Sequence, residues 1–144
     1  MSEAQATVFL WLAFFSLVAA CWGVWSGRRT SRQKATLDFI ADYNNDSRVS
    51  DGFRVIRKKP QDLSTPADRD AFLFLMNKFE ILAMGLKNGI YDKRMVSDTY
   101  GRDLREIYAQ SKPLIEHVRV HEADSEAFCE FEKLANAVKT KNSL

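Results

Sequence analysis

"FLFLMNKFEILAMGLKNGIYD", residues 72–92, is the stretch that best defines the fold of this chain. Its apolar side chains recur every three or four positions, which is the spacing of one face of an α-helix. Thr65, Pro66 and Asp68 supply a capping hydroxyl, a first-turn proline and an acidic residue before it. Asn88-Gly89 is a typical helix end. The sequence therefore predicts a helix over residues 66–87.

The chain downstream of this stretch predicts further helices. Asp92 is placed to cap a short helix that ends at Gly101. Pro113 either kinks or splits the helix after that, because proline cannot donate the next backbone hydrogen bond. Asp124 or Ser125 is placed to cap a last helix.

The chain upstream is also helical in pattern. Residues 28–43 contain neither Gly nor Pro and predict a helix that closes near Asn44-Asn45. Ser50 and Asp51 are placed to cap a short helix that ends at Pro60. No stretch alternates with period two, so the fold class is all-α, with a small helical bundle. Its expected core consists of Phe39, Ile40, Phe72, Leu75, Met76, Phe79, Leu82, Leu104, Ile107, Tyr108 and Phe128.

A charge-free apolar stretch of 24 residues, Ala4 to Gly27, precedes all of this. A membrane-spanning helix needs about 20 such residues. Aromatic residues at the headgroup boundary and basic residues on the cytoplasmic side are typical flanks of such a span. They are present here as Trp22, Trp25, Arg28, Arg29, Arg32 and Lys34. We expect one span in the inner membrane, with the N-terminus outside and the C-terminal domain in the cytoplasm.

The same stretch allows a second interpretation. Val18-Ala19-Ala20-Cys21 resembles a lipoprotein processing site, which would place the rest of the chain outside the cytoplasm. A cleaved signal carries basic residues before its apolar core, whereas Glu3 is the only charged residue there. The apolar run also continues past Cys21 to Trp25. The uncleaved span is favoured, and the lipoprotein remains the alternative.

Small residues recur every fourth position in the apolar stretch, at Ala19, Gly23 and Gly27. They share one helix face, and such faces let two membrane helices approach closely. Self-association through this face is one hypothesis. The other is that Gly and Ala are simply frequent in membrane helices.

The composition divides the 144 residues into three parts: an anchor at 1–27, a basic juxtamembrane helix at 28–45 and a cytoplasmic domain at 46–144. Residues 28–59 hold nine Lys/Arg against four Asp/Glu, although the whole chain has a net charge of only +2. Such charge either attracts anionic lipid or serves only as a topology signal. The weak basic excess and the lack of an aromatic platform argue against nucleic acid as a partner. Two distant cysteines, Cys21 and Cys129, do not suggest a disulfide framework.

Candidate chemistry is sparse. His117 and His121 are four residues apart and can share a helix face, so they are weak candidates for metal ligands. Two surface histidines are the alternative interpretation, because no third histidine completes a site. The chain has neither a phosphate-binding glycine loop nor a GxSxG nucleophile motif. We expect no catalytic residues, no cofactor and no enzyme activity.

Asn77 and Glu80 are the polar residues that stand out, because they lie one turn apart on the most apolar helix. They can form an exposed polar stripe or part of a docking surface. They can also form a half-buried pair that bonds across the bundle, for instance to Arg102 or Arg105, because a buried carboxylate needs a partner. The structural role is favoured.

Met76-Asn77-Lys78-Phe79-Glu80 and Gly89-Ile90-Tyr91-Asp92 carry a resemblance to a known family. Together with the apolar segment and the arginine-rich stop, they resemble a bacterial and prophage-associated family, domain of unknown function 4760. The resemblance covers about residues 5–120, with Met76 in place of the more usual leucine. It implies a single-span, membrane-tethered helical module and assigns no reaction.

The resulting hypothesis is a non-catalytic interaction module held at the membrane. Its expected partners are the lipid bilayer, a membrane or cytoplasmic protein and a second copy bound through the span. The prophage association suggests superinfection exclusion or phage defence. A metal sensor or enzyme that uses His117 and His121 is the alternative.

Overall fold

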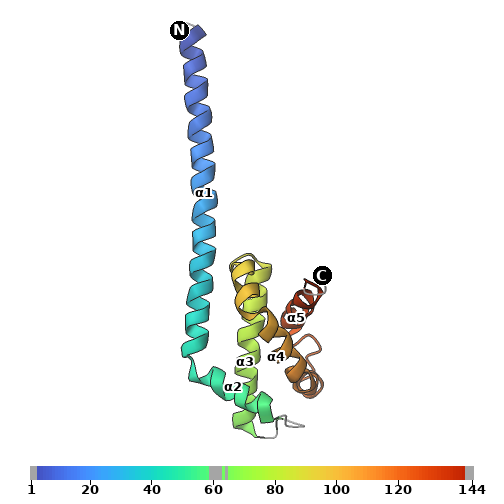
Figure 1. Ribbon diagram of the computed structural model, residues 1–144. Coiled ribbons are helices and arrows are strands. Elements are labelled where there is room, and N and C mark those ends of the chain that lie inside the picture. The colour runs from blue at the N-terminus through green and yellow to red at the C-terminus, as the bar shows by residue number, and fades with distance from the viewer. Residues whose placement is uncertain (1–2, 59–62, 64, 142–144) are drawn as a thin grey trace.

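In the computed structural model the chain is all-α, as the sequence predicts, with five helices among the described residues. They are α1 (Glu3–Asn45), α2 (Ser47–Lys58), α3 (Pro66–Lys87), α4 (Lys93–His121) and α5 (Cys129–Lys141). Figure 1 shows α1 as one long helix whose C-terminal part runs beside a bundle of the other four. The structure describes residues 3–58, 63 and 65–141, with side chains given for Val8 and for most residues from Trp11 to Val138.

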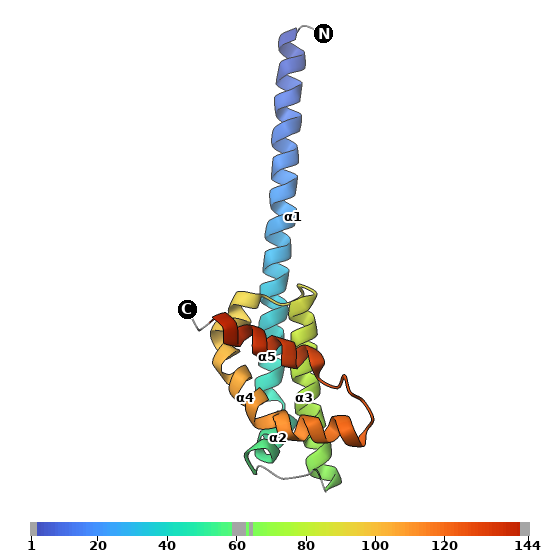
Figure 2. The same cartoon turned by 90° about the vertical axis from the view of Figure 1, so that its right-hand side faces the viewer.

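Helix α1 joins the apolar stretch to the bundle without a break. It ends at Asn45, which confirms the predicted end near Asn44-Asn45. Every side chain from Trp11 to Arg32 is exposed, whereas Thr36 and Tyr43 are buried against the bundle. In both views the N-terminal half of α1 extends well beyond the bundle (Figures 1 and 2). In the part of the chain described here, no helix is both long enough and apolar enough to cross a membrane.

Helix α3 begins and ends where the sequence predicts. Thr65 is the N-cap, and its hydroxyl accepts a hydrogen bond of 3.2 Å from the backbone N–H of Asp68. Pro66 is the first helical residue, and Asn88 is the C-cap. These local signals sufficed because the residues that cap the helix are its sequence neighbours.

Helix α2 begins earlier than predicted. Ser50 and Asp51 lie inside the helix, which starts at Ser47. The carboxylate of Asp46 accepts a 3.1 Å hydrogen bond from the backbone N–H of Arg48, so Asp46 satisfies a donor of the first turn. The helix ends at Lys58, and the predicted stop at Pro60 lies outside the described residues.

Helix α4 is one helix where the sequence predicted a break at Gly101. Gly101 is buried inside it, and a Cβ atom at this position would stand 3.3 Å from Val138 of α5. Glycine therefore serves close packing here instead of ending the helix. Pro113 also lies inside α4, and Figure 2 shows the helix changing direction along its length. A kink at the proline, rather than a split, accounts for both observations.

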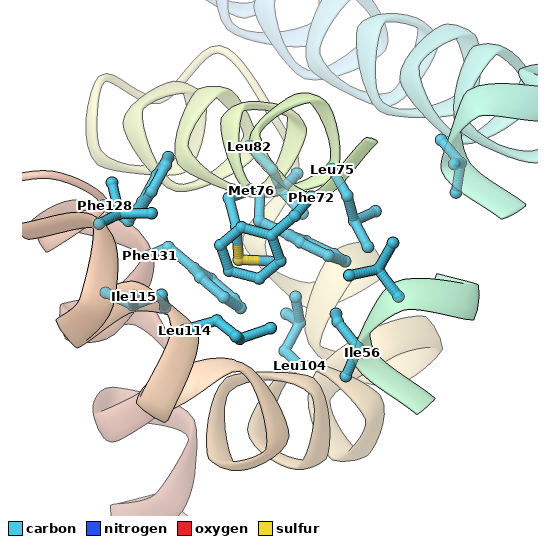
Figure 3. Close-up of a cluster of buried hydrophobic side chains, with 14 of the residues drawn as sticks. Ile56, Phe72, Leu75, Met76, Leu82, Leu104, Leu114, Ile115, Phe128 and Phe131 are labelled. Carbon is cyan, nitrogen blue, oxygen red and sulfur yellow. The ribbon is translucent and has the colours of Figure 1, made fainter. Parts of the chain in front are cut away.

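The core lies between α2, α3, α4 and α5 (Figure 3). Most of the predicted members are buried, namely Phe72, Leu75, Met76, Phe79, Leu82, Leu104 and Phe128. Phe39, Ile107 and Tyr108 are half-buried against it, and Ile40 is half-buried on α1. The largest omission from the prediction is Phe131, which is fully buried and stacks on Phe79 with ring centroids 4.9 Å apart.

Candidate functional site

The α3–α4 turn, residues 88–92, is held in a specific backbone geometry. Gly89 has a φ of +68°, a conformation that glycine adopts without strain. The backbone N–H of Ile90 then donates to the carbonyl of Gly85 at 2.8 Å, and that of Gly89 donates to Leu86 at 3.2 Å. These bonds satisfy carbonyls that the end of α3 would otherwise leave unpaired.

Tyr91 fixes the turn onto α3 and α1. Its ring lies over Gly85, where a Cβ atom would stand only 2.2 Å from the ring. The ring centroid is 5.4 Å from that of Phe39 on α1. Any larger residue at Gly85 would displace the tyrosine, so this glycine allows three elements to meet.

Asp92 and Thr36 form the hydrogen-bonded joint between α1 and the turn. The Asp92 carboxylate caps α4 by accepting from the backbone N–H groups of Arg94 at 2.9 Å and Met95 at 3.2 Å, which confirms the predicted cap. The backbone N–H of Asp92 donates to the Thr36 hydroxyl at 2.8 Å, and that hydroxyl donates to the carbonyl of Arg32 at 2.8 Å. Thr36 is fully buried, so the joint excludes water.

The outer face of the turn is apolar at its tip and basic around it. Ile90 is 53% exposed although its neighbours in the turn are engaged in packing and capping. Lys93 and Arg94 follow it and are exposed. The guanidinium of Arg32 lies 3.4 Å from the point where a Cβ on Gly89 would stand. Cations from α1 and α4 therefore flank one exposed aliphatic side chain.

Glu80 bonds across the bundle, but its partner is the amino end of α5. Its carboxylate accepts hydrogen bonds from the backbone N–H groups of Phe131 at 2.7 Å and Glu130 at 3.1 Å. A carboxylate at this place satisfies otherwise unpaired donors and complements the positive end of the helix dipole. The suggested partners Arg102 and Arg105 are thus replaced by a helix terminus.

This capping from α3 explains why the start of α5 was predicted wrongly. Asp124 forms a turn by accepting from the backbone N–H of Glu126 at 3.1 Å, yet α5 begins only at Cys129. Phe128, just before it, has a φ of +60°, which is strained for a bulky side chain. Burial of the Phe128 ring and the Glu80 cap hold the chain there. Asn77, the other half of the predicted pair, is exposed.

Glu132 is the centre of a polar cluster that the sequence did not predict. The Tyr108 hydroxyl and the Arg119 guanidinium, the latter at 2.8 Å, both bond to its carboxylate, and in that order they lower its pKa. Burial, with Glu132 nearby, raises the pKa of Tyr108 to about 12. Arg119 also donates to the carbonyl of Ala127 at 3.0 Å. The cluster ties the loop before α5 to α4 and is structural in its contacts.

His117 and His121 lie together on the last turns of α4. Their rings stack with centroids 3.9 Å apart, and Nδ1 of His121 is 2.9 Å from the carbonyl oxygen of His117. The described residues contain no group of three or more His, Cys, Asp or Glu side chains that could hold a metal ion. The structure therefore brings the two histidines together without further ligands around them.

The remaining predicted residues all lie on the exposed part of α1. Trp22 is 68% exposed and its ring is 5.6 Å from that of Trp25, over which Arg29 lies at 5.9 Å. Cys21 is exposed on the same helix. Nothing lies within 4 Å of the Cβ positions of Gly23 and Gly27, so the face they share is open. Ala19, the third residue of the predicted association face, is exposed, and so are the predicted topology signals Arg28, Arg29, Arg32 and Lys34.

An open groove lies between α3, α4 and α5, with a volume of about 580 Å³. Its floor is aliphatic, and its rim carries Lys87, Lys93, Arg94, Lys133 and Glu130. Glu130 is bonded to Lys87 at 2.9 Å and to Lys133 at 2.8 Å. Lys87 and Lys133 thus neutralise Glu130, the acidic side chain of the rim. Lys93 and Arg94 then give the part of the rim next to the turn a positive charge.

Sequence reasoning missed Thr36 and Glu132 for different reasons. Thr36 lies among other polar residues of α1, and nothing in the local sequence distinguishes it from them. The acidic Glu132 follows the aromatic Phe131, and only the position of α4 shows which side chains meet it.

The family model described as Domain of unknown function (DUF4760) matches residues 10–138, which run from the exposed half of α1 into α5. No curated protein matches the chain, and no solved structure does.

Proposed function

The chain belongs to the DUF4760 family, and we propose that it is a non-catalytic helical interaction module tethered to a bacterial inner membrane by residues 4–27. The N-terminus lies outside in this proposal, and the bundle lies in the cytoplasm. The bundle then works by presenting its surface to a protein partner at a fixed place next to the bilayer.

The observation that carries the proposal is the apolar surface of the first half of α1. Its large side chains are about half to two thirds exposed, including Leu12 at 61%, Phe15 at 62% and Leu17 at 64%. Full burial of one such side chain is worth about 1.5–3 kcal/mol. A continuous apolar surface of this size on a single helix marks an interaction with a membrane or a protein. The uncharged length of 24 residues favours the membrane.

The charges at the end of this stretch support the orientation. Arg28 and Arg29 follow directly after Gly27, and the N-terminal side has only Glu3 as a charged residue. Basic residues beside a span are retained in the cytoplasm. Trp22 and Trp25 precede them at the place where aromatic rings favour the headgroup boundary.

The rigid connection between the two halves of α1 supports a positional role. No turn interrupts the helix between the apolar stretch and the buried Thr36. The bundle therefore follows the direction of the tether instead of moving on a flexible linker. A role in superinfection exclusion or phage defence stays a prediction from the resemblance.

Membrane fractionation tests the tether. The full chain should remain in the membrane fraction after an alkaline carbonate wash, because the wash removes peripheral proteins. A variant lacking residues 1–27 is the control and should become extractable. Release of the full chain by carbonate would refute the tether.

Self-association through Ala19, Gly23 and Gly27 is a second proposal for the same helix, favoured by the open space at both glycines. In a reporter of membrane-helix dimerisation, Gly23→Ile should lower the signal because the larger side chain prevents close approach. Val24→Ile, on a neighbouring face, is the control. An unchanged signal for Gly23→Ile would refute pairing through this face.

Metal binding at His117 and His121 is the competing function. Zinc titration of the full chain in detergent, with the double variant His117→Ala/His121→Ala as control, separates the two. Heat of binding that the double variant loses would favour the metal site over the proposal of a non-catalytic module.

A further inference from the structure

We propose that the α3–α4 turn is a second membrane contact, in which Ile90 enters the bilayer interface while Lys93 and Arg94, with Arg28 and Arg32 of α1, bind anionic lipid headgroups. The inference rests on the proposed tether and names what the bundle meets once the tether is in place. The partner is the acidic lipid surface itself.

The α3–α4 turn is fixed at the level of Arg32 on α1. The Thr36 hydroxyl holds the backbone N–H of Asp92, and one helical turn earlier the Arg32 side chain lies over Gly89. Arg32 is itself only about 6 Å along the helix axis from Arg28, since each residue of an α-helix rises about 1.5 Å. The turn thus lies beside the segment where the apolar stretch gives way to arginines.

The direction in which the turn points agrees with this level. In both views the α3–α4 turn lies at the end of the bundle nearest the N-terminal half of α1 (Figures 1 and 2). An open groove between α1 and the turn is lined by Gly27, Arg28, Arg32, Gly89 and Ile90, among others. A bilayer that surrounds residues 4–27 would therefore meet this end of the bundle first.

The side chain of Ile90 is an exposed part of the turn. Gly89, Tyr91 and Asp92 each have a role in the fold: a left-handed backbone, packing on Gly85 and capping of α4. The side chain of Ile90 has no such role and is 53% exposed at the tip of the turn. An exposed aliphatic side chain flanked by cations is the arrangement that interfacial membrane contacts use.

The charges at this end of the bundle also favour an anionic surface. Four cations from two helices, Arg28, Arg32, Lys93 and Arg94, lie at this end, and all four are exposed. The carboxylate of Asp92, the acidic side chain within the turn, is occupied in capping α4. Each basic residue near an anionic surface contributes about a five-fold gain in binding. The combined charge is complementary to phosphatidylglycerol and to other acidic lipids.

The test uses the full chain, with Cys21→Ala and Cys129→Ser, in vesicles that contain a lipid-borne fluorescence quencher. A fluorophore is attached at Ile90→Cys or, as the matched control, at Ala67→Cys, which is exposed near the other end of α3. Ala67 and Lys87, the last residue of α3, lie about 30 Å apart along the helix axis, so position 67 is at the opposite end of α3 from the turn. Vesicles of phosphatidylcholine alone are compared with vesicles that also contain phosphatidylglycerol. Carbonate extraction of the same vesicles reports the tether separately.

We expect strong quenching at position 90 in the anionic vesicles and little at position 67. Lys93→Gln and Arg94→Gln should each reduce the docking equilibrium about five-fold, whereas Lys112→Gln, exposed elsewhere on α4, should not change it. Retention of the chain without quenching at position 90 would overturn the inference and leave the tether standing. Equal quenching in both lipids would overturn the role of anionic headgroups. Loss of the chain from the vesicles would refute the tether itself.

Discussion

The two halves of α1 have the same secondary structure and opposite surroundings. From Trp11 to Arg32 every side chain is exposed, whereas Thr36 is fully buried and Tyr43 is 9% exposed. Burial also raises the pKa of the Tyr43 hydroxyl far above its usual range. The C-terminal half is thus part of the bundle, whereas the N-terminal half leaves its large apolar side chains exposed. A continuous helix therefore joins the core of the bundle to an exposed apolar surface.

The largest expected effect is a loss of stability after a substitution in the packed half of α1. Tyr43→Ala should lower the free energy of unfolding of the bundle by about 3 kcal/mol or more, because the ring packs against Phe39, Phe53, Phe79 and Tyr100. Phe14→Ala, on the exposed half, should leave that free energy unchanged. Chemical denaturation in detergent, followed by circular dichroism, measures both. Equal losses would mean that the two halves are not different environments.

The next largest effect is a loss of membrane insertion after a substitution in the exposed half of α1. Val18→Lys places a charge in the middle of the apolar stretch, which costs about 2.5–3.5 kcal/mol for membrane insertion. The fraction of protein that resists carbonate extraction should fall, while the bundle unfolds as before. Ser31→Lys, between Arg29 and Arg32, is the matched control and should stay inserted. A Val18→Lys chain that is retained like wild type would contradict the account.

Glu80 and Asn77 allow the same comparison of a bonded and an exposed residue within the bundle, because Glu80 caps α5 and Asn77 is exposed. Glu80→Ala should lower the stability by about 1–3 kcal/mol, because it leaves two backbone donors of α5 without their partner. Asn77→Ala lies one turn away, is exposed, and should stay within about 0.5 kcal/mol of wild type. Thermal unfolding of the two variants separates the pair. A larger loss for Asn77→Ala would reverse their assignment.

The smallest expected effect concerns pH. Tyr108 and Arg119 lower the folded-state pKa of Glu132 below its usual 4.5, so the folded state binds the proton less readily than the unfolded state. The stability from this cluster is therefore present above about pH 4.5 and is lost as the pH falls through the lower folded value. Tyr108→Phe should cost about 1 kcal/mol at neutral pH and less in acid. Denaturation at several pH values tests this, with the exposed Glu106→Gln as control. A loss that does not depend on pH would contradict the linkage.

Much of the fold follows from local sequence. The predictions that are wrong have one physical cause, which is contact between residues far apart in the chain. Thr65, Asn88 and Asp92 cap helices through neighbours in the chain, so pattern alone located those ends. The start of α5 depends on Glu80, 50 residues earlier, and no local signal encodes that contact. The expected helix end at Gly101 is wrong, because the role of this glycine, close packing against Val138, exists only in the folded chain.

The candidate site was predicted in part for the same reason. The arginines and tryptophans at the end of the apolar stretch are recognisable from composition. The role proposed for Ile90 is not, because it depends on the contacts of Thr36 and Tyr91 that place the turn beside Arg32. In the motif Gly89-Ile90-Tyr91-Asp92, three residues build the turn and Ile90 is exposed.

Reporters fused to the C-terminus of the full chain test directly whether residues 4–27 anchor the chain and whether the bundle lies in the cytoplasm. Green fluorescent protein fluoresces only when it folds in the cytoplasm, and alkaline phosphatase is active only outside it. The account predicts a fluorescent, carbonate-resistant fusion with the first reporter and an inactive fusion with the second. An active phosphatase fusion would place the bundle outside the cytoplasm, and a fluorescent fusion that carbonate releases would show that residues 4–27 do not anchor the chain.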